Sequence, residues 1–230
     1  MNKVLITGGT GLVGTALIEK LLANNIKVAV LSRSPKKENE YKWDIANGYI
    51  DKKAFEGVTH IIHLAGAGIA DKKWSTFRKR VLINSRVASA NLLFKKVQEL
   101  GIKLKGFISA SGIGYYGAVT VANEFKEQDT SGNDFIAKIC VEWEQAAKQF
   151  EEIKVPVTIL RIGIVLSEKG GALQKINTPL FLSSLGSGKQ YMPWIHIDDL
   201  VNILFIAIED DTFKGIYNCL LYTSPSPRDA

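Results

Sequence analysis

The sequence predicts an α/β fold of the Rossmann type, a doubly wound parallel sheet with helices on both faces, followed by the start of a small C-terminal substrate region. Two observations support this prediction. Short apolar runs alternate with longer segments of helical periodicity, which is typical of βαβ units. The first of these units also joins its strand to its helix through a glycine-rich turn, Gly8–Gly14.

The first fourteen residues match the dinucleotide-binding fingerprint. Lys3–Thr7 is predicted to be a buried strand, and helical periodicity follows over Leu12–Ala23. The helix N-terminus would offer free N–H groups and a partial positive charge to a pyrophosphate. An ordinary strand–helix turn is the alternative, but it would not need three glycines in seven residues. The predicted cofactor contacts in the turn are Gly8, Gly9, Thr10, Gly11, Leu12, Val13 and Gly14.

Composition and charge restrict the class of protein. The chain has 230 residues, 46% of them hydrophobic and 23% charged, as in a soluble globular protein. No apolar run approaches the ~20 residues that span a bilayer, and no signal peptide is predicted, so we expect a cytoplasmic protein without a membrane partner. The two cysteines, Cys140 and Cys219, argue against a disulfide framework.

The charge is uneven along the chain. Residues 1–110 carry 19 Lys and Arg against 8 Asp and Glu, whereas residues 111–230 carry 10 against 15. The basic half suits a phosphorylated cofactor or solvated helix faces. Its lysine pairs are scattered and lack interleaved aromatic residues, so we expect no nucleic-acid partner. A homodimer remains open.

The second predicted strand, Ile26–Leu31, is followed by Ser32, Arg33 and Ser34. This position faces the adenosine ribose in dinucleotide folds, where an acidic residue binds the 2′-hydroxyl and an arginine accommodates a 2′-phosphate. Arg33 therefore favours NADP(H), with NAD(H) as the alternative cofactor. Asp44 follows where such folds often place an aspartate near the adenine amine.

A third apolar strand lies within residues 58–66 and runs into a glycine turn, where Leu64, Ala65 and Gly66 would let the backbone pass close to the cofactor. His60 and His63 are three apart and should point to opposite faces of this strand, so we predict no metal site there.

The alternation of helices and strands continues towards the C-terminus. Helical periodicity over Lys73–Leu100 is followed by a fourth strand at Leu104–Ala110, a helix at Asn133–Glu152 and a fifth strand at Val155–Ile162. Each glycine-rich turn comes at the carboxyl end of a strand, where parallel sheets bind ligands. The sequence therefore predicts the site at this edge of the sheet.

From Ser167 onward, the alternation of strands and helices becomes less regular. We expect a dinucleotide-binding domain over residues 1–166 and a partial substrate region over 167–218. Within that region, Trp194 and His196 are candidate substrate contacts before a helix whose predicted N-cap is Asp198. A strand follows at Lys214–Asn218. Residues 219–230 look non-native and disordered, as if a truncated reading frame ran into cloning sequence, and they do not enter the fold prediction.

Together these motifs resemble the extended, epimerase/dehydratase-like branch of the short-chain dehydrogenase/reductase superfamily. The resemblance covers Met1–Asn218 and implies NAD(P)-dependent chemistry on a small molecule, with family members continuing into a further C-terminal segment. It is supported by the segments 7–14, 63–66, 109–111, 116–117 and 194–200. The segments 71–74, 114–117 and 143–144 narrow it to an atypical subgroup, the epimerase family proteins, whose reaction is largely undefined.

The superfamily's catalytic apparatus is a serine with a Tyr-x-x-x-Lys pair, in which the lysine lowers the tyrosine pKa. The resemblance puts the serine on Ser111 but the pair on Ile136 and Cys140, and it puts Arg86 where an asparagine is usual. Arg86, Ser109, Ile162 and Gly163 complete the cofactor contacts that the resemblance implies.

Other residues in the same region would have to replace the missing pair. Tyr115 or Tyr116 could bring a phenol near the nicotinamide, or either could be a structural aromatic. Cys140 could be an active thiol if Arg86 or the cofactor lowered its pKa, or it could be buried and inert. Two functions follow: an NADP-dependent oxidoreductase or epimerase acting on an unknown small molecule, or a catalytically silent NADP(H)-binding protein that reports redox state to a partner.

Overall fold

Eight strands form one sheet in the computed structural model, which describes residues 2–118, 124–176 and 192–221. The strands are β1 Lys3–Thr7, β2 Lys27–Ser32, β3 Glu40–Asp44, β4 Tyr49–Ile50, β5 His60–His63, β6 Gly106–Gly112, β7 Val157–Ile162 and β10 Gly215–Cys219. Their order across the sheet is β10-β7-β6-β5-β1-β2-β3-β4. Every neighbouring pair is parallel except β3 and β4 at one edge.

The strand order confirms the doubly wound prediction. From β1 the chain moves outward through β2 to β3, then returns to the other side of β1 and continues through β5, β6 and β7. The order therefore reverses between β1 and β5, where Leu5 pairs with both Ala29 and Ile61. In open α/β sheets the crevice at such a point, outside the carboxyl ends of the strands, binds the ligand.

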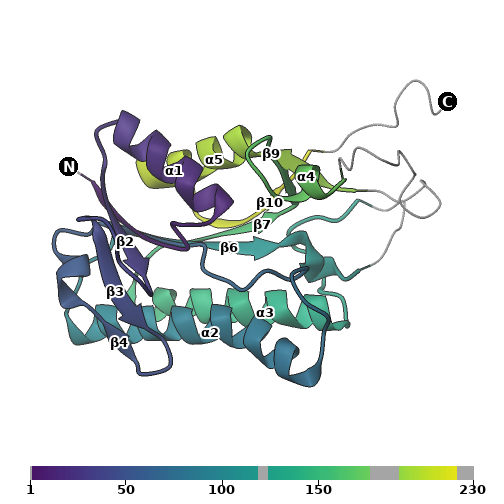
Figure 1. Cartoon of the computed structure of the whole chain (residues 1–230), viewed down its shortest axis with the longest axis horizontal. Helices are drawn as coiled ribbons and strands as arrows, with labels where there is room; N and C mark the ends of the chain where they lie inside the picture. The colour runs from purple at the N-terminus through teal and green to yellow at the C-terminus, as the bar shows by residue number, and fades with distance from the viewer. Residues whose placement is uncertain (1, 119–123, 177–191, 222–230) are drawn as a thin grey trace.

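Helices cover both faces of the sheet (Figure 1). Helices α1 (Leu12–Ala23) and α5 (Ile197–Glu209) lie on one face, and α2 (Thr76–Glu99) and α3 (Phe135–Lys148) lie on the other. Alternate residues of β1 enter the two cores, because successive side chains of a strand point to opposite faces: Leu5 packs with the α2 and α3 side, and Ile6 with the α1 and α5 side. Burial on both faces explains the nearly continuous apolar strands.

Several shorter elements complete the described residues. Strands β8 (Ile164–Leu166) and β9 (Trp194–His196) form a separate two-stranded parallel sheet. A five-residue helix α4 and three 3-10 turns lie between the larger elements: α4 Ala172–Ile176, η1 Lys52–Phe55, η2 Ile113–Tyr116 and η3 Gln149–Ile153. The helix predicted over Asn133–Glu152 is thus α3 followed by η3. No helix among the described residues is long and apolar enough to cross a membrane.

Three local predictions need correction. Strands β3 and β4 were missed, because β4 has only two residues at the edge of the sheet and Trp43 is the one buried residue of β3, so the apolar signal of both is weak. The N-cap of α5 is His196, whose Nδ1 accepts from the Asp198 N–H at 3.3 Å, so the prediction of Asp198 was wrong. Strand β10 begins and ends one residue later than predicted, at Gly215 and at buried Cys219, and Leu221 forms a bridge with Trp194, so the prediction that disorder begins at residue 219 was wrong. Residues 222–230 lie outside the described residues.

Candidate cofactor and active site

The glycine turn between β1 and α1 is closely packed. Gly8 has a φ of 72°, and a Cβ on it would lie 2.9 Å from the carbonyl of Leu64, at the end of β5. A Cβ on Gly14 would lie 2.3 Å from the carbonyl oxygen of Gly8. Gly11 is the N-cap of α1 and has no side chain to accept from the first turn, whose N–H groups have no partner within the helix. The turn therefore presents open donors at the point where the strand order reverses.

Arg33 lies one residue past the end of β2, the strand that pairs in parallel with β1. Lys42 donates from Nζ to the Arg33 carbonyl, and Ser32 Oγ accepts from the Ser34 N–H at 3.2 Å, so the strand end is fixed by local bonds. The Arg33 side chain is exposed and makes no hydrogen bond or ion pair with any described residue. It is therefore free to bind a ligand.

Asp44, at the end of β3, has local partners instead. Its carboxylate accepts from the backbone N–H of Asn47 at 3.2 Å and from the Asn47 side-chain amide at 2.8 Å. These hydrogen bonds hold the pKa of Asp44 below its usual range. Asp44 thus stabilises the β3–β4 turn in the described structure.

A buried polar chain connects β1, β5 and α2. Thr7 Oγ1 accepts from the Ala65 N–H at 3.1 Å and lies 2.8 Å from Nδ1 of His63, whose Nε2 lies 3.1 Å from Ser89 Oγ. Burial lowers the pKa of His63 to about 4, so its ring is neutral at pH 7. These hydrogen bonds fix the backbone over residues 64–66, the predicted cofactor loop.

Arg86 projects from α2 against the same loop. Its Nη2 donates to the Ala67 carbonyl at 3.1 Å and its Nη1 to the Leu82 carbonyl at 2.9 Å. The guanidinium lies 4.9 Å from the ring centre of Trp143, and a Cβ on Gly66 would lie 2.9 Å from Cζ. Arg86 is only 6% exposed, and this burial lowers its pKa.

Ser111, near the carboxyl end of β6, is part of a buried ionic network. Its Oγ donates to Oε1 of Glu144 at 2.8 Å. Arg161 of β7 holds the same carboxylate with two parallel hydrogen bonds, Nε to Oε1 at 2.8 Å and Nη2 to Oε2 at 2.9 Å. Burial disfavours the charged Arg161, but the bonds to Glu144 outweigh it and raise the guanidinium pKa.

The two candidate tyrosines differ in how their hydroxyls are bonded. Tyr116 is buried, and its hydroxyl accepts from Arg161 Nη1 at 2.9 Å while lying 2.7 Å from Oδ1 of Asn218 and 3.0 Å from the Lys126 carbonyl. Burial raises the pKa of Tyr116. Tyr115 instead stacks its ring over the Arg161 guanidinium at 3.3 Å, and its hydroxyl makes no hydrogen bond with the described residues. Tyr115 therefore has the free hydroxyl.

Ile136 and Cys140 lie beneath the loop that follows Ser111. A Cβ on Gly114 would lie 2.3 Å from Ile136 Cγ2, and one on Gly112 would lie 3.6 Å from Cys140 Sγ. The two positions that correspond to the missing Tyr-x-x-x-Lys pair therefore do face the serine loop. Burial raises the pKa of Cys140 to about 11, more than the nearby Arg86 lowers it, so the thiol is protonated at neutral pH.

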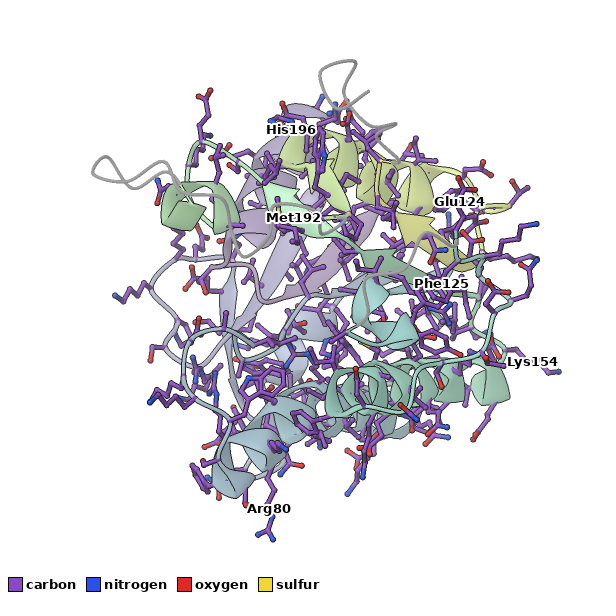
Figure 2. All side chains as sticks on the ribbon, turned by 90° about the vertical axis from the view of Figure 1, so that its right-hand side faces the viewer. Arg80, Glu124, Phe125, Lys154, Met192 and His196 are labelled. Atoms are coloured by element: carbon purple, nitrogen blue, oxygen red, sulfur yellow. The ribbon has the colours of Figure 1, made fainter. Side chains whose placement is uncertain are left out.

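The remaining predicted residues lie around the same edge of the sheet. Ser109 is buried in β6 and donates to the Ala110 carbonyl at 3.0 Å. Gly163 follows Ile162 at the end of β7, and its N–H donates to the Cys219 carbonyl at 3.0 Å. Trp194 and His196 belong to β9. In the view onto this edge, His196 lies on the α5 side and Arg80 of α2 on the opposite side (Figure 2).

Two residues of the network received no role from the sequence. The sequence analysis includes Glu144 only as part of a family motif and assigns no role to Arg161. A signal was present, since each is a charged residue inside an apolar pattern, Glu144 on the inner face of a helix and Arg161 within a buried strand. Buried charges of this kind are paired.

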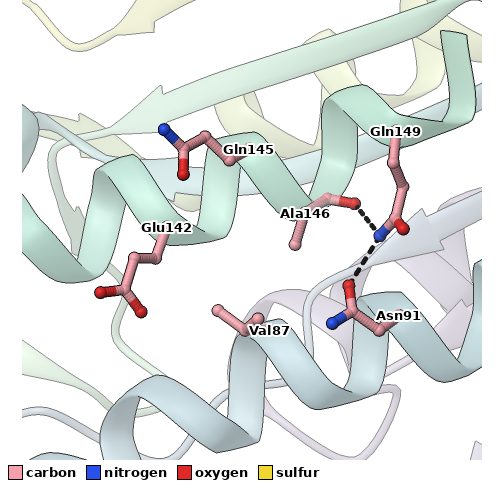
Figure 3. A pocket seen from close by; sticks show the side chains of 6 residues that line it. All are labelled: Val87, Asn91, Glu142, Gln145, Ala146 and Gln149. Atoms are coloured by element: carbon pink, nitrogen blue, oxygen red, sulfur yellow. Dashed lines mark hydrogen bonds between the residues drawn. The ribbon is translucent and has the colours of Figure 1, made fainter.

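A shallow groove of about 320 Å³ lies elsewhere, between α2 and α3 (Figure 3). A hydrogen bond from Gln149 Nε2 to Asn91 Oδ1, 2.7 Å long, crosses one end of it. The groove is lined by Val87, Asn91, Glu142, Gln145, Ala146 and Gln149. None of these is a predicted site residue.

The fold and the glycine turn define a dinucleotide-binding protein of the Rossmann type. The model of the NAD dependent epimerase/dehydratase family matches residues 4–219. An epimerase family protein of Mycobacterium bovis is 35% identical over 229 residues, which cover 97% of this chain and 74% of that protein. The chain belongs to the NAD dependent epimerase/dehydratase family.

Solved structures agree. The nucleoside-diphosphate sugar epimerase from Corynebacterium glutamicum superposes with a TM-score of 0.84 at 32% identity, over 95% of this chain but only 46% of that one. The human epimerase family protein SDR39U1, solved with NADPH, superposes with a TM-score of 0.81 at 30% identity, over 95% of this chain and 74% of that one. Both confirm the fold, and the human protein also confirms the resemblance to the epimerase family proteins.

Proposed function

We propose that the protein binds NADP(H) and acts as an oxidoreductase or epimerase on a small molecule. The observation that carries the proposal is the turn of Gly8–Gly14, whose close packing leaves the first-turn N–H groups of α1 open where the strand order reverses. Such donors at a helix N-terminus bind phosphate groups. When bound, the nicotinamide would supply or accept a hydride.

The preference for NADP(H) over NAD(H) rests on Arg33. Its side chain is exposed and has no partner among the described residues, which suits a 2′-phosphate. No acidic residue replaces it at the end of β2, where Ser32 and Ser34 flank it. The human relative solved with NADPH supports the same cofactor.

The proposed catalytic groups are Ser111 and Tyr115. The only hydrogen of the Ser111 hydroxyl goes to Glu144, so Oγ offers lone pairs to a substrate hydroxyl. Tyr115, whose hydroxyl makes no hydrogen bond with the described residues, is the better proton donor or acceptor of the two tyrosines. Arg161 stacks under its ring and fixes its position. Cys140, protonated and buried, has no proposed role in proton transfer.

Deuterium transfer tests this proposal without a known substrate. The protein would be incubated with NADPH deuterated at the transferable C4 position and a fractionated metabolite extract, and mass spectrometry would search for labelled products. A labelled product that disappears with Tyr115→Phe would support an oxidoreductase. An epimerase returns its hydride, so its signature would be transient reduction of NADP⁺ seen in the nicotinamide absorbance. If NADPH binds but neither signal is observed, the proposal is contradicted.

Three observations favour the second candidate function, a catalytically silent NADP(H) sensor. The hydroxyl of Tyr116 and the hydrogen of Ser111 are both committed to buried partners, and the Cys140 thiol is protonated. A sensor would bind NADPH as tightly with Tyr115→Phe as without it and would transfer no deuterium. An enzyme would also keep its NADPH affinity in this variant, so the two functions are separated by deuterium transfer in the wild-type protein, which only the enzyme shows.

A further inference from the structure

Three buried donor nitrogens have no acceptor among the described residues: Nε of Arg78, Nε of Arg86 and Nε1 of Trp143. They occur together. Arg86 lies over the Trp143 ring at 4.9 Å, and Arg78 is close enough to Arg86 to lower its pKa. Buried polar groups in proteins nearly always have partners, and a guanidinium lacking one has a particular cost because it is charged.

Arg78 and Arg86 both reach the loop that follows β5. Arg86 Nη2 donates to the carbonyl of Ala67 at 3.1 Å, and Arg78 Nη2 donates to the next carbonyl, that of Gly68, at 2.5 Å. The two guanidiniums are therefore bonded to adjacent residues of the same loop, whose Cα atoms are about 3.8 Å apart. The backbone bonds fix both side chains while leaving each Nε–H free.

Few acidic residues among the described residues lie near Arg78 and Arg86. Arg86 has no ion pair among the described residues, and Arg78 has only Asp71, at 3.9 Å and with the carboxylate 58% exposed. An exposed pair at that distance contributes little. Helix α2 adds Lys79 and Arg80 and carries no acidic residue before Glu99. The site is thus a partly buried double cation in a basic surrounding.

We propose that Arg78 and Arg86 bind an oxyanion of the substrate, a carboxylate or a phosphate. Guanidinium N–H groups match the geometry of these anions, and a partly buried, basic site concentrates them. The site lies against Gly66, in the predicted cofactor loop, because a Cβ there would contact Arg86 at 2.9 Å. This inference rests on the proposed function, since it places the charged end of the substrate beside the cofactor loop.

Calorimetry with two probes, inorganic phosphate and malonate, tests the site. Each would be titrated into the NADPH-saturated protein at constant ionic strength, and we expect at least one to bind. Arg78→Gln is the main variant, because Arg78 is the less buried of the two arginines and its loss should disturb the fold less than the loss of Arg86. It should weaken binding at least tenfold, whereas Arg78→Lys, which keeps the charge without the planar fork, should weaken it less.

Arg80→Gln is the matched control. Arg80 is exposed on the same helix, so its loss removes the same charge without touching the site (Figure 2), and we expect affinity within twofold of wild type. Nitrogen-15 NMR gives a second readout: the Nε–H signals of Arg78 and Arg86 and the indole N–H of Trp143 should shift on binding. Because these signals are observed in the wild-type protein, they remain informative if Arg78→Gln does not fold.

Four outcomes would overturn the inference. One is no binding of either probe with NADPH bound. Another is an equal loss with Arg80→Gln, which would mean an adventitious ion only. Unmoved Nε–H signals would place the anion elsewhere. Probe binding that NADPH abolishes would assign the arginines to the cofactor's own phosphates. Failure of the proposed function is distinguishable, because NADPH itself would then not bind to the wild-type protein.

Discussion

Ser111 donates its hydroxyl hydrogen to Glu144 over 2.8 Å, and the same carboxylate oxygen accepts from Arg161 over 2.8 Å. The serine is therefore held by a buried ion pair and keeps lone pairs on Oγ. A ligand at Ser111 would have to donate a hydrogen bond to it, as a substrate hydroxyl can and a carbonyl cannot. The ion pair also joins β6, α3 and β7 beneath the site.

Breaking this ion pair should destabilise the protein strongly. Glu144→Gln leaves the Arg161 charge buried without a carboxylate, and we expect the free energy of unfolding to fall by about 3–5 kcal/mol. Urea unfolding measures it. The control is Glu142→Gln, which removes an exposed pair with Lys138 on the same helix and should cost less than about 1 kcal/mol. Equal effects of the two variants would contradict a structural role for the buried pair.

His63 should make stability depend on pH. Its folded pKa, about 4, lies below the ordinary value of 6.5, so the unfolded chain takes up the proton first as the pH falls. The stabilisation is present in full above pH 6.5 and is lost towards pH 4, by up to about 3 kcal/mol. Urea unfolding of wild type and His63→Gln across this range would show it, since the variant should lack this slope. His196→Gln, at an exposed histidine, should retain the slope.

The Cys140 thiol should resist alkylation. With a pKa of about 11, on the order of one thiol in ten thousand is ionised at pH 7, and burial blocks access as well. Iodoacetamide labelling of the native protein, read by mass spectrometry of the Cys140 peptide, should be far slower than for the same peptide in urea. Rapid native labelling at pH 7 would show an activated thiol and would restore Cys140 as a catalytic candidate.

Gly14→Ala should abolish dinucleotide binding. The new Cβ would lie 2.3 Å from the Gly8 carbonyl oxygen, a distance that backbone atoms cannot accept, so the turn must open. Calorimetry with NADPH measures the loss. Ala23→Gly, at the exposed far end of the same helix, is the control: it should cost about 1 kcal/mol of stability and leave affinity unchanged. Normal NADPH affinity in Gly14→Ala would rule out the turn as the binding site.

Local patterns determined how much of the fold could be predicted. The strand at Lys3–Thr7 and the helix at Leu12–Ala23 have the predicted bounds, because apolar period and glycine spacing are properties of neighbouring residues. The strand Glu40–Asp44, next to the edge of the sheet, was missed because its apolar signal is weak. The N-cap of α5 was misassigned by two residues because an imidazole took the role that the sequence gave to a carboxylate.

The candidate site was harder to predict, because its decisive contacts join distant residues. The family resemblance predicted Ser111, and Tyr115 and Tyr116 were candidates to replace the missing pair, but the sequence could not distinguish between the two tyrosines. That distinction depends on Asn218, which lies 102 residues away along the chain. The pairing of Glu144 with Arg161 likewise depends on the packing of α3 against β7. Sequence alone showed only two charges in apolar segments.

The most direct test of the account is calorimetric titration of the wild-type protein with NADPH and NADH. We predict that NADPH binds more tightly, and that Arg33→Ala weakens NADPH binding by about 1–3 kcal/mol while leaving NADH binding nearly unchanged. Lys27→Ala, which removes an exposed charge from the other end of β2, should alter neither affinity. Binding of neither cofactor by the folded protein would contradict the central claim, and equal affinities unaffected by Arg33→Ala would contradict the assignment of the 2′-phosphate site.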